Sequence, residues 1–126
     1  MDNPYHILII DDSQVILGTY QKFFNKKNYR VSTATNGLDG LKLLESEEKF
    51  DAVITDIVMP NISGVGIIAI VKKKYPKLPV IGITGWGEQP EILASEASAD
   101  LVLEKPIDLI KLDKIIVELI KKTALV

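Results

Sequence analysis

HILIIDD, residues 6–12, is the stretch of sequence that decides the fold, because a run rich in Ile ends directly at two acids. A nearly continuous apolar run of this length predicts a β-strand that is covered on both faces. Four further short runs are expected to form strands: Tyr29–Thr33, Ala52–Thr55, Pro79–Ile83 and Leu101–Leu103. The run Tyr29–Thr33 alternates between polar and apolar residues, which is typical of an edge strand.

The segments between these runs have apolar residues at helical spacing. Helices are predicted to start near Ser13, Asn36, Gly64, Pro90 and Leu109. The apolar faces predicted for them are Ile16, Tyr20, Phe23 and Phe24; Leu38, Leu41 and Leu44; Ile67, Ile70 and Val71; Ile92, Leu93 and Ala97; and Leu109, Leu112, Ile115, Ile116 and Leu119. By helix propensity, Gly18 and Gly40 each cost about 1 kcal/mol relative to Ala.

Five strand–helix pairs predict an α/β fold in which helices cover both faces of a parallel sheet. Right-handed crossovers restrict the topology, and a five-stranded chain fits the doubly wound, flavodoxin-like order 2-1-3-4-5. We expect a single (βα)5 domain over residues 1–126, with a core from about residue 6 to residue 122.

Composition excludes several classes of function. The chain has 126 residues, and 47% hydrophobic with 25% charged residues is typical of one globular domain. Fifteen basic against seventeen acidic residues give a net charge of −2, which disfavours nucleic-acid binding. The absence of cysteine excludes disulfides, thiolate catalysis and Cys-based zinc sites, and one histidine leaves no basis for Ser-His or multi-His metal chemistry. We expect His6 to be structural.

The N-terminal sequence MDNPYHILIIDD lacks the basic segment that starts a secretory signal. The longest mainly apolar stretch, Val65–Val71, is far shorter than the ~20 residues that span a bilayer. A cytoplasmic protein without a membrane partner is therefore expected.

Polar and charged residues follow the predicted strands. Asp11 and Asp12 follow the first, Asp56 the third, Thr84 the fourth and Lys105 the fifth. The carboxyl ends of parallel strands share one edge of the sheet, where ligands of such folds bind. In the order 2-1-3-4-5 the first and third strands are neighbours, so the three aspartates are expected to meet where the winding reverses.

Three carboxylates within a few Å repel one another unless a cation joins them. Oxygen ligands suit a hard divalent cation, and Mg²⁺ fits best because it takes one or two carboxylates together with phosphate oxygens. Lys105 can pair with a phosphoryl oxygen and Thr84 can donate a hydrogen bond to another. One aspartate can itself be the nucleophile and form an acyl phosphate.

Four motifs carry a resemblance to a known family: IIDDSQVIL (residues 9–17), ITDIVMPNISG (54–64), VIGITGWG (80–87) and LVLEKPI (101–107). In this order and spacing the chain resembles the receiver domain of two-component response regulators, from about Ile7 to Ile120. The resemblance implies that Asp56 accepts the phosphoryl group, that Thr84 is the switch hydroxyl and that Lys105 pairs with the phosphate. It also implies a cis peptide bond between Lys105 and Pro106.

The resemblance implies a magnesium site as well. Asp12 would bind Mg²⁺ directly, Asp11 mostly through water, and Asp56 and the main-chain carbonyl of Val58 would complete the protein ligands. The phosphoryl group would come from a sensor histidine kinase or a histidine phosphotransfer protein. The domain would catalyse only its own modification, so it would not be an enzyme in the usual sense.

The implied output is a surface that binds a partner protein, formed by the fourth helix, fifth strand and fifth helix. The protein would be a monomer or a phosphorylation-dependent dimer. No output domain is expected within residues 1–126, which leaves open a stand-alone receiver or a piece of a larger regulator.

The sequence departs from the family pattern at three places. Val102 stands where the family usually has the aromatic residue that moves with the switch threonine, which puts the usual form of signalling in doubt. Val58 and Trp86 place apolar side chains beside the route of attacking water, and we expect them to slow hydrolysis of the acyl phosphate. Ser98 replaces a common glycine. After the Met59-Pro60 turn, Gly64 is expected to supply a permissive backbone conformation.

Other interpretations remain for these residues. Asp11 or Asp12 could simply cap a helix, Thr84 could be a core hydroxyl, and Lys105 could be a solvated charge. The lysines at 72–74 and 77 are expected to be a solvated helix end. A haloacid-dehalogenase-like phosphatase would need an acid at position 58, where this chain has Val58. A flavin or dinucleotide site would need a glycine motif that the sequence lacks. A receiver that no longer takes phosphate is a further alternative.

Overall fold

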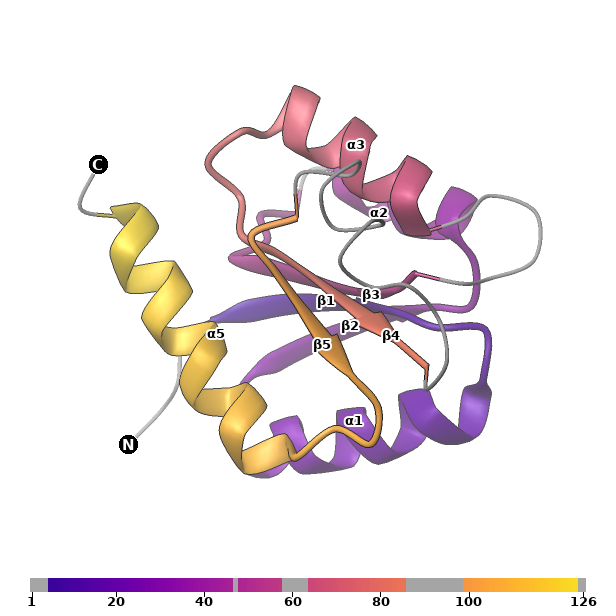
Figure 1. The fold of residues 1–126 in the computed structure, drawn as a ribbon, viewed down its shortest axis with the longest axis vertical. Helices are drawn as coiled ribbons and strands as arrows, with labels where there is room; N and C mark the ends of the chain where they lie inside the picture. The colour runs from indigo at the N-terminus through magenta and orange to yellow at the C-terminus, as the bar shows by residue number, and fades with distance from the viewer. Residues whose placement is uncertain (1–4, 47, 58–63, 86–98, 125–126) are drawn as a thin grey trace.

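The computed structural model describes residues 5–46, 48–57, 64–85 and 99–124 (Figure 1). Its elements are β1 (His6–Ile10), α1 (Gln14–Lys26), β2 (Arg30–Ala34), α2 (Gly37–Glu45), β3 (Ala52–Asp56), α3 (Gly64–Lys74), β4 (Val80–Thr84), β5 (Leu101–Glu104) and α5 (Leu109–Ala124). The helix predicted from Pro90 lies outside the described residues. Predicted and observed strands agree to within one residue at each end.

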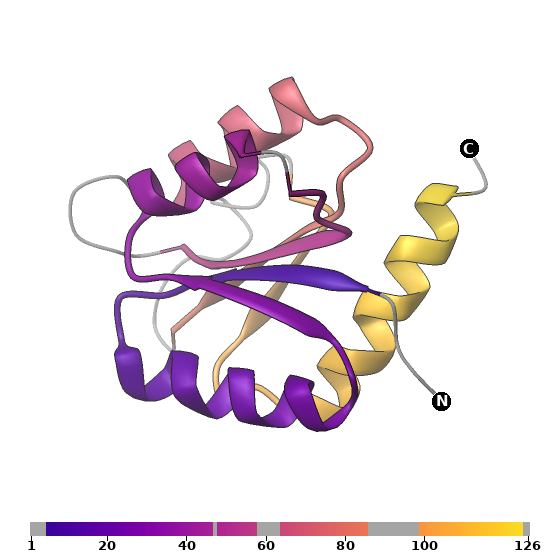
Figure 2. The same cartoon turned by 180° about the vertical axis from the view of Figure 1, so that it is seen from behind.

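The five strands form one parallel sheet in the order β2-β1-β3-β4-β5. This confirms the predicted doubly wound, flavodoxin-like fold and the position of β2 at an edge. Helices α1 and α5 cover one face and α2 and α3 cover the other (Figures 1 and 2). Because β1 and β3 are hydrogen-bonded neighbours, the residues that follow them lie side by side.

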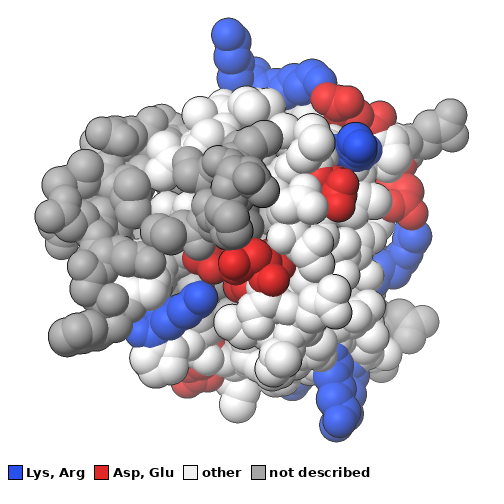
Figure 3. All heavy atoms as spheres, turned by 90° about the vertical axis from the view of Figure 1, so that its right-hand side faces the viewer, with Lys and Arg blue, Asp and Glu red and all other residues white. Residues whose placement is uncertain are grey.

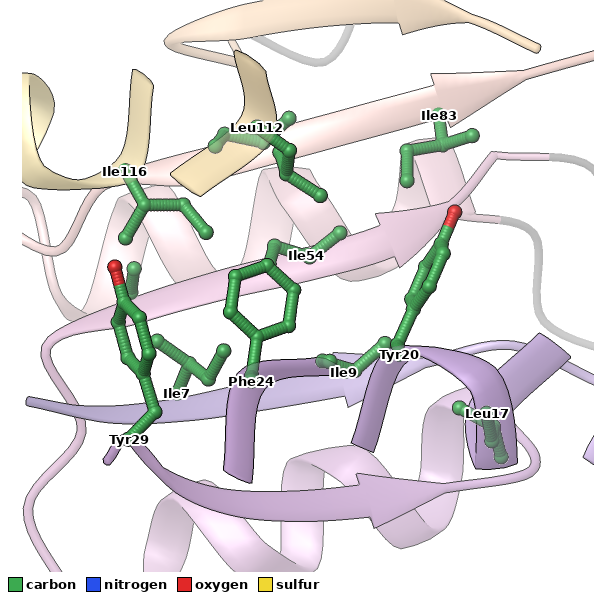
Figure 4. Packing of buried hydrophobic residues seen from close by; sticks show 12 residues of the cluster. Ile7, Ile9, Leu17, Tyr20, Phe24, Tyr29, Ile54, Ile83, Leu112 and Ile116 are labelled. Atoms are coloured by element: carbon green, nitrogen blue, oxygen red, sulfur yellow. The ribbon is translucent and has the colours of Figure 1, made fainter. Parts of the chain in front are cut away.

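Alternate residues of each strand point to opposite faces of the sheet, and this divides the core into two clusters. Ile7, Ile9 and Ile54 pack with Phe24 of α1 and with Leu112 and Ile116 of α5 (Figure 4). On the other face, Leu8, Ile10 and Val53 pack against Ile67 and Val71 of α3. The central strands are buried on both sides, which is why their sequences are nearly continuously apolar.

Two residues predicted for the core are exposed instead. Leu38 is 53% exposed and Ile70 is 44% exposed. The buried positions of α2 are Gly37, Gly40 and Leu44, and those of α3 include Ile67 and Ile68. Each helix is therefore rotated relative to the predicted face. In α2 the side that meets the sheet contains Gly37 and Gly40, and in α3 it contains Ile68.

Gly40 allows α2 to approach the sheet closely. A Cβ atom at this position would lie 2.4 Å from Cδ1 and 2.9 Å from Cγ1 of Ile10, which is fully buried. The close packing of α2 on the sheet therefore offsets the low helix propensity of glycine. Gly18, in contrast, has no atom within 4 Å of the corresponding position.

Of the lysines predicted to form a solvated helix end, Lys73, Lys74 and Lys77 are exposed, whereas Lys72 is not. Its side chain is 18% exposed. Its ammonium donates to the carbonyls of Pro76 and Leu78, each at 3.1 Å, and to Asp100 Oδ2 at 3.0 Å. The same oxygen of Asp100 accepts from the backbone N–H of Val80 at 2.7 Å, so the pair joins the end of α3 to the starts of β4 and β5.

His6 has the structural role that the sequence suggested. It is 4% exposed, and its ring packs against Phe50 with 4.2 Å between centroids. Nδ1 lies 3.0 Å from the carbonyl oxygen of Lys49 and Nε2 lies 2.8 Å from Ser32 Oγ. Both ring nitrogens are thus occupied by structural contacts.

None of the helices in the described part of the chain combines the length and apolar character that a membrane span requires.

Candidate functional site

Three aspartates meet at the carboxyl edge of the sheet. Asp11 follows β1, Asp12 is the next residue, and Asp56 is the last residue of β3. One carboxylate oxygen from each lies within 4.8 Å of the others. Figure 3 views the side of the molecule on which acidic atoms gather in this way, with a basic side chain beside them. Asp11 is 2% and Asp56 is 6% exposed, whereas Asp12 is open to solvent.

The turn into α1 holds the first acid in place. The backbone N–H of Ser13 donates to Asp11 Oδ1 at 2.8 Å, and the backbone N–H of Asp11 donates to the carbonyl of Ala34 at 3.1 Å. The N-cap of α1 is Ser13, whose hydroxyl accepts from the N–H of Ile16 at 3.3 Å. The side chain that caps the helix is therefore that of Ser13 and not that of Asp11 or Asp12.

Burial makes this cluster electrostatically costly. Desolvation is the main cause that raises the pKa of Asp11, and the neighbouring Asp12 raises it further. The Ser13 N–H and the positive charge of Lys105 oppose these effects in part. The pKa of Asp11 is higher in the folded protein than in the unfolded chain. Asp11 therefore lowers stability as pH rises from its unfolded-state pKa to its folded-state pKa, and the loss persists at higher pH.

Replacing Asp11 with Asn should therefore stabilise the metal-free protein. Asn can still accept from the Ser13 N–H, so the turn is kept, while one buried charge is removed. We expect Asp11→Asn to raise the free energy of unfolding at pH 7 by about 1 kcal/mol, the repulsion of two unit charges at this separation in water. Urea unfolding measures this gain, which should disappear at pH 3, and a less stable variant at pH 7 would contradict it.

Lys105 brings a positive charge to the cluster from β5. Its Nζ lies 3.4 Å from Asp56 Oδ2, and its side chain is 32% exposed. Its backbone N–H donates to the carbonyl of Thr84 at 2.8 Å, which fixes the chain just after both strands end. The peptide bond between Lys105 and Pro106 is cis, as the resemblance implied.

Thr84 ends β4 beside Asp56. Thr84 is fully buried, and its hydroxyl donates to the carbonyl of Gly85 at 3.5 Å. The neighbouring residue Ile83 pairs with Asp56 across the sheet. The structure thus brings Asp11, Asp12, Asp56, Thr84 and Lys105 to one edge. Val58 and Trp86, which the sequence placed near this site, lie outside the described residues.

Gly64 begins α3 directly against the backbone of the site. Its N–H donates to the carbonyl of Ile57 at 2.7 Å. A Cβ atom here would lie 2.2 Å from the carbonyl oxygen of Asp56 and 2.5 Å from Cα of Ile57. The prediction of a permissive backbone conformation is corrected: the φ of Gly64 is not in the left-handed region that favours glycine, and the glycine is required because a side chain has no space here.

Tyr20 is a neighbour of the site that the sequence assigned only to the core. It is 6% exposed and lies on α1, with its hydroxyl directed toward the end of the sheet where Ile83 lies (Figure 4). Burial, followed by the charges of Asp11 and Asp56, raises the pKa of Tyr20 to about 12. Its hydroxyl therefore stays protonated beside the acids. The sequence feature that could have indicated this contact is the position of Tyr20, a polar aromatic residue two helical turns after the acid pair.

Val102, the departure from the family pattern, is partly buried in the cluster on the α2 and α3 side of the sheet. It pairs with Gly82 of β4. Its side chain carries no ring that could rotate between two positions, so the described structure contains no aromatic toggle at this point of β5.

Comparisons with known proteins agree with this architecture. Residues 7–117 match the response regulator receiver domain family. The chain is 34% identical over 106 residues to the transcriptional regulatory protein GlrR of Escherichia coli K12, covering 83% of this chain and 24% of that protein. It is 36% identical over 102 residues to the response regulator SaeR of Staphylococcus epidermidis, covering 80% of this chain and 44% of that protein.

Solved structures give the same result. A response regulator receiver domain protein from Clostridium thermocellum has a TM-score of 0.88 at 34% identity, with 96% of this chain and 98% of that chain covered. The response regulator TrrA of Thermotoga maritima, solved in complex with Mg(2+)-BeF, has a TM-score of 0.81 at 29% identity, covering 91% and 98%.

Fold and site together define a doubly wound α/β signalling domain with an acidic edge. The chain belongs to the response regulator receiver domain family of two-component systems. The match spans 24% of the length of GlrR and 44% of the length of SaeR.

Proposed function

We propose that this domain is a phospho-accepting switch and that Asp56 takes the phosphoryl group. The observation that carries the proposal is the position of Asp56, which is nearly buried, grouped with two acids and 3.4 Å from the Lys105 ammonium. A structural ion pair would not need two additional carboxylates that raise its cost.

The acidic group fits a bound Mg²⁺ ion. Its donors are hard carboxylate oxygens close enough to share one cation, and a cation would relieve the repulsion among them. Asp12, Asp11 and Asp56 would hold the ion together with the main-chain carbonyl of Val58. When bound, Mg²⁺ supplies charge neutralisation for phosphoryl oxygens.

The protein residues then have separate roles. A carboxylate oxygen of Asp56 forms a bond to phosphorus while the bond from phosphorus to the donor atom breaks, and the donor leaves with that electron pair. Lys105 pairs with an oxygen of the transferred group. The hydroxyl of Thr84 donates to another oxygen and thereby couples phosphorylation to the end of β4. The domain would catalyse only its own phosphorylation and dephosphorylation at Asp56, and it would not turn over external phosphoesters.

We infer a histidine kinase or histidine phosphotransfer protein as the donor, acting in the cytoplasm. The output partner would bind a surface that includes β5 and α5, and phosphorylation would change its affinity. With Val102 in β5, this change would depend on backbone shifts at Thr84 rather than on an aromatic side chain. The domain acts alone or within a larger regulator, as a monomer or as a phosphorylation-dependent dimer.

Acetyl phosphate tests the proposal directly. Incubation with acetyl phosphate and Mg²⁺ should add one phosphoryl group to the protein, read by intact mass. The gain should disappear when EDTA replaces Mg²⁺, and hydroxylamine should remove the group because acyl phosphates are labile to it. A protein that stays unmodified in Mg²⁺ would contradict the proposal.

A further inference from the structure

Tyr20 carries a buried polar group that the proposed phosphoryl transfer does not use. The residue is 6% exposed and belongs to the core cluster between the sheet and helices α1 and α5. Among the described residues, every fully enclosed side-chain nitrogen or oxygen atom has a hydrogen-bond partner, whereas none of these residues forms a hydrogen bond with the Tyr20 hydroxyl. The hydroxyl therefore lies at a surface that a ligand can reach.

This surface is the wall of a cavity of about 550 Å³ that Tyr20, Gly85 and Lys105 line together. The Lys105 ammonium lies 3.4 Å from Asp56 Oδ2, so the cavity reaches the proposed phosphoryl acceptor. Figure 4 shows the Tyr20 hydroxyl directed toward Ile83, which is the residue that pairs with Asp56 across the sheet. The hydroxyl and the ammonium thus approach Asp56 from one cavity.

Alternation along the strands places the acids on the side of the sheet that Tyr20 covers. Asp56 follows Ile54 by two residues and Asp11 follows Ile9 by two, and both isoleucines pack in the cluster that contains Tyr20. Burial and the charges of both acids raise the pKa of Tyr20 to about 12, so its hydroxyl keeps its proton. Tyr20 is therefore a hydrogen-bond donor close to anions, although neither carboxylate accepts from it in the described structure.

We propose that the Tyr20 hydroxyl donates a hydrogen bond to an oxygen of the phosphoryl group on Asp56. The inference rests on the proposed function and adds a residue to the same site. Phosphorylation turns the carboxylate into a larger and more highly charged group, whose oxygens reach donors that the carboxylate itself does not reach. Lys105 and Thr84 serve two of these oxygens, and Tyr20 adds a donor from the α1 side of the sheet. Tyr20 binds the product of the transfer and is not a nucleophile.

Beryllofluoride with Mg²⁺ is the probe of this hydrogen bond, because it places a tetrahedral anion on the carboxylate and needs no transfer reaction. We expect Tyr20→Phe to weaken the binding of beryllofluoride about tenfold, the effect of one hydrogen bond to a charged group. Binding of Mg²⁺ alone should be unchanged, and isothermal titration calorimetry measures both affinities. In ¹³C NMR spectra of the tyrosine-labelled parent, the phenolic carbon signal of Tyr20 should shift with beryllofluoride and Mg²⁺ but not with Mg²⁺ alone.

Tyr75→Phe is the matched control. It removes the same atom from a hydroxyl that donates to the carbonyl of Leu44 at 3.2 Å, in the cluster on the other side of the sheet. This variant should lose stability in urea and should bind beryllofluoride like the parent. Tyr20→Phe, in contrast, should be no less stable than the parent, because its hydroxyl has no protein partner to lose.

The outcomes separate this inference from the proposed function. Equal affinity of Tyr20→Phe and the parent for beryllofluoride would overturn the inference alone. An equal loss of affinity for Mg²⁺, which would place the hydroxyl beside the metal, or a loss of stability like that of Tyr75→Phe would also overturn it. A parent protein that does not bind beryllofluoride in the presence of Mg²⁺ would overturn both the inference and the proposed function.

Discussion

Asp56→Asn is expected to abolish phosphorylation completely. An amide oxygen has no negative charge and is a poor nucleophile, so no acyl phosphate can form at this position. The parent protein should gain one phosphoryl group from acetyl phosphate and Mg²⁺, and the variant should gain none in the same time by intact mass. The effect should exceed that of any other single change in the site, since the other residues assist a reaction that Asp56 itself performs.

Two controls make this result interpretable. Glu104→Gln removes an exposed acid one residue before Lys105, and this variant should be labelled like the parent. Asp56→Asn should also be no less stable than the parent in urea, because it removes one of three clustered charges. A phosphoryl group on the folded Asp56→Asn protein would place the acceptor at another residue.

Gly64→Ala is expected to be the most destabilising change of comparable size. The new methyl group would lie 2.2 Å from the carbonyl oxygen of Asp56 and 2.5 Å from Cα of Ile57, so backbone has to move. Backbone displacement in a packed region costs about 2–4 kcal/mol, and we expect this loss in the free energy of unfolding by urea. Because the same shift moves Asp56, labelling by acetyl phosphate should slow as well, even at temperatures where the variant is folded.

Gly18→Ala provides the matched comparison. The substitution is identical, but no atom lies within 4 Å of the added carbon, and Gly18 is on the exposed side of α1. The variant should gain about 0.5–1 kcal/mol in stability through helix propensity and label normally. If Gly64→Ala were as stable as the parent, the close contact between the start of α3 and β3 would not exist in solution.

Local sequence determined the elements and their ends. Apolar runs such as His6–Ile10 specify buried strands because side chains alternate between two covered faces. The placement of Asp11 and Asp56 at strand ends followed from the same pattern. Together with the topology rules for parallel sheets, this pattern predicts that the acids, Thr84 and Lys105 share one edge of the sheet, as they do in the structure.

Only the tertiary structure decided the close contacts between distant segments. The sequence could not distinguish Gly18 from Gly40, since one faces solvent and the other meets Ile10. It also could not reveal that Tyr20 lies beside the acids or that Asp100 holds Lys72. Periodicity specifies which side of a helix is apolar, whereas the rotation and distance of that helix on the sheet depend on how all facing side chains pack together.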